Sequence, residues 1–328
     1  MKQNTTYHTL WQTAAALALL LLPMACSPEE NVAIEEVRQP IRLTAQVGTV
    51  TRSANDSQND CFDENTFMTI YPYQSTSPYT TAGPVLGAAF SSPGIDYHTH
   101  AAVNKKNELV SAMADPAFPS TGNATLVGIH PVIGSTTFSG TYPNHTFTVK
   151  SDQSAPADYK VSDLMAASAS SPKTDDAINL QFSHKLAKVS VTFRSAAGTP
   201  NISKVELLSI LPSVSVNVNT AAVGTATGTS TNIALYNNTT GTNAETTVSA
   251  VVPAQTAKSS GTAFLRFTFA GGGTITWSLD ASLTLTAGNH YQYDLQVGLL
   301  NIGVLNTTVT DWQADGSTET SQQHTVYV

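Results

Sequence analysis

The sequence contains very little cysteine and very little charge. Cys26 and Cys61 are its only cysteines, so it holds neither a disulfide framework nor a cysteine-based zinc site. Charged residues make up 12% of the 328 residues, and the net charge is −8. The basic residues form no cluster, which argues against nucleic acid as a partner. Stability must therefore come from a buried hydrophobic core, for which the chain is long enough.

Long helical patterns are also scarce, because beyond the N-terminus only 158–169 shows a weak 3.6-residue period. Few charges together with many Thr, Val and Tyr residues favour strands. Turn residues recur between short alternating runs, as in a β-sandwich. We therefore predict an all-β protein. Expected strands include Phe67–Tyr73, Asp96–His100, Leu126–His130, Ile178–Phe182, Leu186–Phe193, Ile202–Ile210, Val214–Val218, Thr247–Val252, Phe264–Phe269, Tyr291–Val297 and Ile302–Val309.

The N-terminus is typical of an exported protein. Lys2 precedes an apolar run over Ala14–Leu22, which matches a secretory signal and is too short to span a membrane. The small residue before Cys26 resembles a lipobox, although Pro23 stands where leucine is usual. We predict a lipoprotein signal peptide over 1–25, lipidation of Cys26 and a flexible tether over 26–40. Signal cleavage with loss of Cys26 is the alternative.

The first strand is expected at Ile41–Val50, directly before a polar connector. Its apolar positions are Ile41, Leu43, Ala45 and Val47, and they alternate with polar residues. Arg52 follows, and Ser53–Asp60 has no apolar face. Proteases cut exposed polar connectors, so an Arg-specific protease acting between Arg52 and Ser53 would release one complete strand. The emptied slot would invite a strand from another molecule. An ordinary first strand followed by a loop is the alternative interpretation.

The polarity of the chain peaks at Ser168–Asp176, where we expect an interdomain linker. We therefore predict an N-terminal β-sandwich domain over 41–172. A C-terminal β-sandwich domain with a C-terminal tail is expected over 173–328.

Patterns of catalytic and metal sites are weak or missing. The sequence holds no nucleophile elbow, HExxH motif or phosphate-binding loop, so we predict no enzyme activity and no cofactor. Asp96, His98 and His100 alternate and would share one face of a strand. We expect exposed loop residues there and no metal. Trp277 and Trp312 are expected to fill the core or cover a sheet edge and not to form ligand platforms.

Three groups of residues occur in a characteristic order. They are Thr51-Arg52, then Asp163-Leu164-Met165 leading to Phe182-x-His184-x-Leu186-Ala187-Lys188-Val189, and finally Leu285-x-Ala287-Gly288-x-x-Tyr291-x-Tyr293-x-Leu295 followed by Asp311-Trp312. In this order and spacing, from about Ile41 to Gln313, the chain resembles the fimbrillin family, the Mfa-like or FimA-like subunits of type V pili.

The resemblance implies two transthyretin-like β-sandwich domains in tandem and export to the outer membrane as a lipoprotein. It also implies Arg-specific removal of the first strand at the cell surface, donor-strand exchange with other pilin subunits, and support of cell adhesion. The family's donor is the C-terminal tail, and here the alternating end His324–Val328 is shorter than the strand Ile41–Val50. A pilus-anchoring or tip subunit, or a monomeric surface lipoprotein that binds a host protein or glycan, is the alternative.

Overall fold

The computed structural model describes residues 39–47, 62, 66–74, 77–78, 95–99, 108–111, 118, 123–133, 144–218, 220–238 and 245–312. Within them the regular secondary structure consists of strands and one short helix, which confirms the predicted all-β class. The elements are β1 (Leu43–Val47), β2 (Phe67–Gln74), β3 (Ser77–Pro78), β4 (Ile95–Thr99), β5 (Leu109–Ser111), β6 (Ala124–His130), β7 (Asn144–Thr148), α1 (Pro156–Ser162), β8 (Met165–Ser171), β9 (Ile178–His184), β10 (Ala187–Ser195), β11 (Ile202–Ile210), β12 (Ser213–Asn217), β13 (Ala222–Val223), β14 (Thr231–Asn237), β15 (Glu245–Val252), β16 (Gln255–Lys258), β17 (Ala263–Phe269), β18 (Thr274–Ser278), β19 (Leu283–Leu285), β20 (Asn289–Val297) and β21 (Ile302–Asp311).

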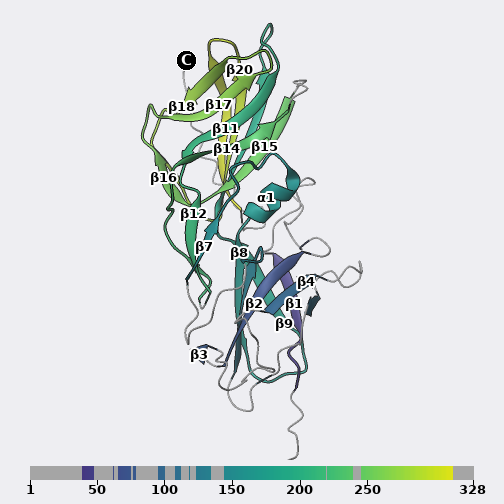
Figure 1. Ribbon diagram of the computed structural model, residues 1–328. Coiled ribbons are helices and arrows are strands. Elements are labelled where there is room, and N and C mark those ends of the chain that lie inside the picture. The colour runs from purple at the N-terminus through teal and green to yellow at the C-terminus, as the bar shows by residue number, and fades with distance from the viewer. Residues whose placement is uncertain are drawn as a thin grey trace, which may run out of the picture. The chain divides into compact units, whose positions relative to one another are not determined.

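The first sheet contains most strands of the N-terminal half (Figure 1). Its order is β1-β9-β8-β6-β2-β4-β5, and β3 pairs with β2 outside this path. β1 and β9 run parallel, whereas the other neighbours along the path are antiparallel. The two end strands also meet, because Thr44 of β1 forms an isolated antiparallel bridge with Glu108 beside β5.

Two four-stranded sheets form a sandwich in the C-terminal half. Their orders are β15-β10-β20-β21 and β14-β11-β17-β18, with β10 and β20 parallel. The sheets pack face to face, since the ring of Phe193 on β10 lies 5.8 Å from that of Phe267 on β17. β10 is central in its sheet, and its residues Val189, Val191 and Phe193 are fully buried. Smaller sheets are formed by β13-β12-β7 and by β16-β19.

The chain crosses between the two halves more often than the sequence predicts. β7 pairs with β12, and the side chain of Gln153 bonds the backbone of Val251 as donor at 2.9 Å and as acceptor at 2.8 Å. Residues 144–153 therefore contact strands of the C-terminal half. β8 and β9 then return to the first sheet.

The predicted domain boundary between residues 172 and 173 does not coincide with the division between sheets. It assigns β9 to the C-terminal half, whereas β9 pairs with β1 and β8 in the first sheet. The reason is that β9 buries its apolar side in the first sheet, while the polar stretch after β8 is only the β8–β9 connection. The first sheet ends at His184, and the next begins at Ala187.

Only the first part of the weak helical pattern over 158–169 forms a helix. α1 begins at Pro156, whose fixed φ suits the first turn of a helix, and ends at Ser162. The Ser162 hydroxyl donates to the Asp158 carbonyl and accepts the Lys150 N–H, which ties the end of the helix to the preceding segment. Residues 165–171 form β8, so the predicted linker overlaps a strand of small side chains.

Candidate functional site: the first strand and its surroundings

β1 is an end strand with one full neighbour. It runs parallel to β9 in the register Leu43↔Ile178 to Val47↔Phe182. The N–H of Ile178 donates to the carbonyl of Arg42 at 2.8 Å, just before β1 begins. On its other side, among the described residues, β1 has only the bridge between Thr44 and Glu108. Among the described residues, this edge of β1 therefore makes one isolated bridge instead of a continuous strand pairing.

The inner face of β1 is completely buried, as the alternation of its residues predicts. Ile41, Leu43, Ala45 and Val47 are each between 1% and 4% exposed. Beside them on β9 the registered partners of the same face include Leu180 and Phe182, both fully buried. This segment is therefore an integral part of the core, so its loss would uncover a row of apolar side chains.

Phe182 forms a fixed part of the core next to β1. Its ring meets that of Phe62 edge to face at a centroid distance of 5.0 Å. On the other side it lies so close to Gly128 of β6 that a Cβ built there would be 2.6 Å from Cζ of Phe182. A glycine is therefore required at residue 128 for this aromatic ring to reach its place.

The outer face of β1 carries polar side chains that continue onto β9. The Thr44 hydroxyl donates to Oδ1 of Asn179 at 3.3 Å, and Nδ2 of Asn179 donates to Oε1 of Gln46 at 3.2 Å. These contacts are exposed to solvent, so each adds little stability. The inner apolar face provides the main attachment.

The segment before β1 is also held in place. Gln39 donates through Nε2 to the carbonyl of Thr174 at 2.7 Å and to the carboxylate of Asp175. The carbonyl of Gln39 accepts the N–H of Phe118 at 2.9 Å. Gln39, which falls within the tether predicted for 26–40, is therefore bound to the fold.

Several residues singled out in the sequence lie outside the described residues: Cys26, Arg52, Ser53, Cys61, His100 and the tail 313–328. Asp96 and His98 are on β4, where Asp96 accepts the hydroxyl of Thr69 at 2.8 Å and His98 faces the ring of Phe67. The described residues contain no group of three His, Cys, Asp or Glu side chains suited to a metal ion. They also contain no helix long and apolar enough to cross a membrane.

The structure brings together parts of the sequence pattern that lie far apart along the chain. Nδ1 of His184, at the end of β9, donates to Oδ1 of Asp163 at 2.9 Å, and both side chains are buried. The ring of Trp312, just after β21, stacks on that of His184 at 3.7 Å with an interplanar angle of 11°. The ammonium of Lys188 lies 5.7 Å from the centroid of Trp312. We call Asp163, His184, Lys188 and Trp312 the junction cluster.

The junction cluster ties the first sheet to the last strand of the sandwich. Trp312 is 5% exposed, and its backbone N–H donates to the carbonyl of Gly288 at 2.6 Å. Trp312 thus has the core position that the sequence predicts for it. His184 is hydrogen-bonded to the buried Asp163, which sequence spacing alone does not reveal because the two residues lie 21 positions apart.

Comparison with known proteins gives a consistent assignment. The family model described as fimbrillin-like matches residues 51–312, a range that begins after β1. Among solved structures, a candidate cell adhesion protein from Bacteroides uniformis has 21% identity and a TM-score of 0.60, with 83% of this chain and 98% of that chain covered. One from Bacteroides ovatus has 17% identity and a TM-score of 0.62, with 85% and 99% covered. No curated protein matches the sequence.

The two solved structures support the fold, and the family match covers most of the chain. The ordered residue pattern that resembles fimbrillins falls largely within the matched range, and its second and third parts meet in the junction cluster. The chain belongs to the fimbrillin-like family.

Proposed function

We propose that this protein is a structural subunit of a fimbria at the cell surface, which assembles with other pilin subunits by donor-strand exchange. Membership of the fimbrillin-like family supports the fimbrial role and a structural function in place of a catalytic one. The observation that supports this assembly mechanism is the position and burial of β1. It is an end strand with one full neighbour and a completely buried apolar face.

Strand exchange depends on β1 becoming a separate segment. Burial of Leu43 or Val47 contributes about 1.5–3 kcal/mol each, and each backbone hydrogen bond adds about 0.5–1.5 kcal/mol. While β1 is covalently attached, its effective concentration is too high for a free strand to compete. Once the connector is cut, β1 can dissociate, and a donor strand held in a growing polymer can occupy its place by pairing with β9.

We propose that cleavage occurs between Arg52 and Ser53, by an Arg-specific protease. Three other arginines are protected by backbone pairing. The carbonyl of Arg42 accepts a hydrogen bond from Ile178, while Arg194 and Arg266 lie within β10 and β17 with neighbouring strands on both sides. Cleavage at Arg38 would leave β1 attached, because Arg38 precedes the strand.

Lipidation of Cys26 would place the subunit on the outer membrane before assembly. The sequence before residue 39 supplies a signal-like apolar run, then Cys26, then an acidic polar stretch. Acyl chains on a single cysteine anchor a protein without spanning the bilayer. The anchoring segment precedes β1, so the cut that frees β1 from the rest of the chain would also free the subunit from its anchor.

We further propose that the subunit consists of two transthyretin-like sandwich domains in tandem. The sheet orders β15-β10-β20-β21 and β14-β11-β17-β18, with parallel pairing of β10 and β20, support this for the C-terminal half. Sheet membership supports a domain division between His184 and Ala187, with residues 144–153 joining the second domain.

A second candidate role is that of an anchoring or tip subunit, or of a monomeric adhesin, that keeps β1. The complete burial of the apolar side chains of β1 favours it, because a strand held in the core in this way can remain in place. In this case the chain would remain attached through Cys26.

The mass of the intact protein recovered from the cell surface distinguishes these roles. A stem subunit is expected to begin at Ser53, and the same protein from cells grown with an inhibitor of Arg-specific proteases to begin at acylated Cys26. If untreated cells yield only the form beginning at acylated Cys26, the stem role is contradicted and the anchoring or monomeric role is supported.

A further inference from the structure

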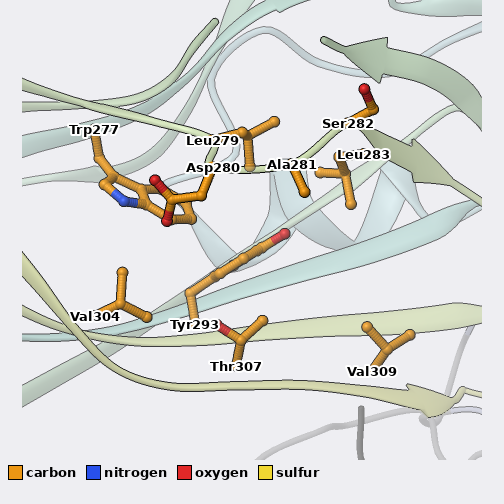
Figure 2. A pocket seen from close by; sticks show the side chains of 10 residues that line it. All are labelled: Trp277, Leu279, Asp280, Ala281, Ser282, Leu283, Tyr293, Val304, Thr307 and Val309. Carbon is orange, nitrogen blue, oxygen red and sulfur yellow. The ribbon is translucent and has the colours of Figure 1, made fainter. Parts of the chain in front are cut away.

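The C-terminal sandwich has a pocket at its open side. β18 is the last strand of one sheet and β21 the last strand of the other, and the pocket lies between them. Its volume is about 250 Å³. Figure 2 shows Val304, Thr307 and Val309 of β21 on one side and the segment from Trp277 to Leu283 on the other. The pocket is therefore formed by elements outside the first sheet and independent of β1.

The pocket has a rigid aromatic wall. The rings of Trp277 and Tyr293 meet at a centroid distance of 5.2 Å with an interplanar angle of 63°. Phe264 supports both rings, at 6.2 Å from Trp277 and 5.8 Å from Tyr293. Phe264 is fully buried and Tyr293 is 4% exposed, whereas Trp277 is only partly buried. Trp277 packs against the core from the end strand β18, as expected of a residue that covers a sheet edge, and it keeps accessible surface toward the pocket.

A β-bulge in β21 shapes the opposite wall. The pairing register of β20 and β21 shifts so that Asp294 pairs with Asn306 and Leu295 with Val304, which leaves Leu305 unpaired and 51% exposed. In a regular strand, Val304 and Thr307 would point to opposite faces. The extra residue lets Val304, Thr307 and Val309 all line the pocket.

The rim of the pocket is polar, and the charged residue among the lining residues, Asp280, is acidic. Asp280 and Ser282 are exposed beside it, and Thr307 adds a hydroxyl. None of the described lining residues is basic, and no ion pair involves Asp280 within the described part of the chain. A carboxylate accepts hydrogen bonds, and the two hydroxyls can donate or accept them. The pocket therefore suits a neutral ligand with several hydroxyl groups and does not suit an anion.

We propose that this pocket binds one hexopyranose unit of a neutral glycan. A pyranose ring presents an apolar C–H face, which fits the accessible indole of Trp277, and hydroxyl groups at its edge that fit Asp280, Ser282 and Thr307. A volume of about 250 Å³ lies just below the range of about 300–1,000 Å³ for drug-sized ligands, so a single ring is the expected size. The net charge of −8 further disfavours acidic sugars.

A cationic ligand fits these observations less well. A cation is held best by a cage of several aromatic faces, but Tyr293 is almost fully buried, so only Trp277 offers accessible ring surface in this pair. Asp280 is exposed at the rim, where solvent and salt screen its charge. Shape and hydrogen bonding therefore favour the sugar.

The proposal is tested by saturation-transfer NMR on the full chain with β1 in place. The panel consists of methyl glycosides of glucose, galactose, mannose and N-acetylglucosamine, together with sialic acid and choline. At least one neutral glycoside is expected to bind with a Kd on the order of 1 mM, as for a small ligand. Neither sialic acid nor choline is expected to compete with it.

Variants assign the binding to the pocket. Trp277→Ala is expected to weaken binding at least about 10-fold and Asp280→Asn about 3- to 10-fold, in line with the loss of one stacking surface or one charged hydrogen bond. Asp176→Asn, which removes an exposed carboxylate outside the pocket, should leave the Kd unchanged. Because Trp277→Ala can disturb folding, Asp280→Asn and Ser282→Ala at exposed positions provide a second measure.

Failure of every neutral glycoside to bind, or equal binding by the parent and both rim variants, would overturn the proposal. Stronger binding of choline than of any glycoside would assign the pocket to a cation and would also overturn it. The assay uses uncleaved monomer, so its result is independent of whether donor-strand exchange occurs.

Discussion

Gly128 is the residue at which the core next to β1 is most tightly constrained. A Cβ at this position would lie 2.6 Å from Cζ of Phe182 and 3.2 Å from Cδ1 of Ile70. Both neighbours are fully buried and cannot move freely. We expect Gly128→Ala to lower the free energy of unfolding by about 1–3 kcal/mol, as overpacking of a core does. Urea denaturation measures the change.

Gly271 provides the matched control for this substitution. It lies in the turn between β17 and β18, and a Cβ there would meet no atom within 4 Å. Gly271→Ala is expected to change the free energy of unfolding by no more than about 0.5 kcal/mol. Equal effects of the two substitutions would contradict the close packing of Phe182 on β6.

His130 is expected to make stability depend on pH. Desolvation by burial lowers the pKa of His130 below its ordinary value of 6.5, although a hydrogen bond to the carbonyl of Phe67 and the nearby Asp163 oppose this. The unfolded chain then binds the proton more readily than the folded chain. The contribution to stability is therefore complete above pH 6.5 and decreases as the pH falls toward the lowered pKa.

The test is a series of urea denaturations between pH 7.5 and pH 5, approximate limits that bracket the ordinary histidine pKa. The parent should lose stability as the pH falls, and His130→Gln should show a smaller loss over the same interval. Burial also lowers the pKa of His145, so some dependence on pH should remain in the variant. An identical dependence in parent and variant would show that His130 does not contribute.

At the residue scale, the sequence identifies important side chains but not their partners. Asp163, His184 and Trp312 are all recognisable as parts of an ordered pattern. Their mutual contacts could not be predicted, because β10 to β21 separate Trp312 from His184 along the chain and only the folded arrangement brings the two rings together. The pocket wall of Val304, Thr307 and Val309 likewise depends on the bulge in β21, which leaves no clear signal in the sequence.

At the scale of the element, β1 should be held mainly by its inner face. Leu43 is 4% exposed, whereas Gln46 on the outer face is exposed. We expect Leu43→Ala to lower the free energy of unfolding by about 2–5 kcal/mol. Gln46→Ala should lower it by at most about 1 kcal/mol, because only an exposed hydrogen bond from Asn179 is lost. Denaturation curves with similar midpoints for the two variants would contradict this assignment of faces.

Strands with clear alternation were predictable, and those of small or uniform residues were not. The predicted range Ile202–Ile210 coincides with β11, and the predicted strand Phe264–Phe269 differs from β17 by one residue. β8 was missed because its Ala and Ser residues have little hydrophobic contrast, so part of it was assigned to a linker. The parallel pairing of β1 with β9 was also unpredictable, since the paired residues lie 135 positions apart.

At the scale of the molecule, the crossing of the chain between sheets should keep the two halves together after a cut. The buried residues of both halves form a single continuous cluster, and residues 144–153 pair with strands of the C-terminal half. We expect a protease cut within 172–177 to yield two fragments that co-elute in size-exclusion chromatography. They should separate only in denaturant. Separation under native conditions would instead indicate two independent domains.

The class of the whole molecule was predictable because composition and alternation extend along the entire chain. The boundary between sheets was not, because the local peak of polarity at 168–176 marks a connection within the first sheet. Sheet membership is decided by long-range pairing, which a scan for polar linkers does not detect.

The most direct test of the central claim is assembly triggered by cleavage after Arg52. Parent, Arg52→Ala and Arg38→Ala proteins are treated with an Arg-specific protease and examined by electrophoresis in mild SDS. Because β1 forms one side of the core and can leave only as a separate segment, the parent and Arg38→Ala should form ladders, and Arg52→Ala should remain a folded monomer. The claim is contradicted if Arg52→Ala polymerises as readily as the parent, or if the cleaved parent stays monomeric even with a donor segment supplied.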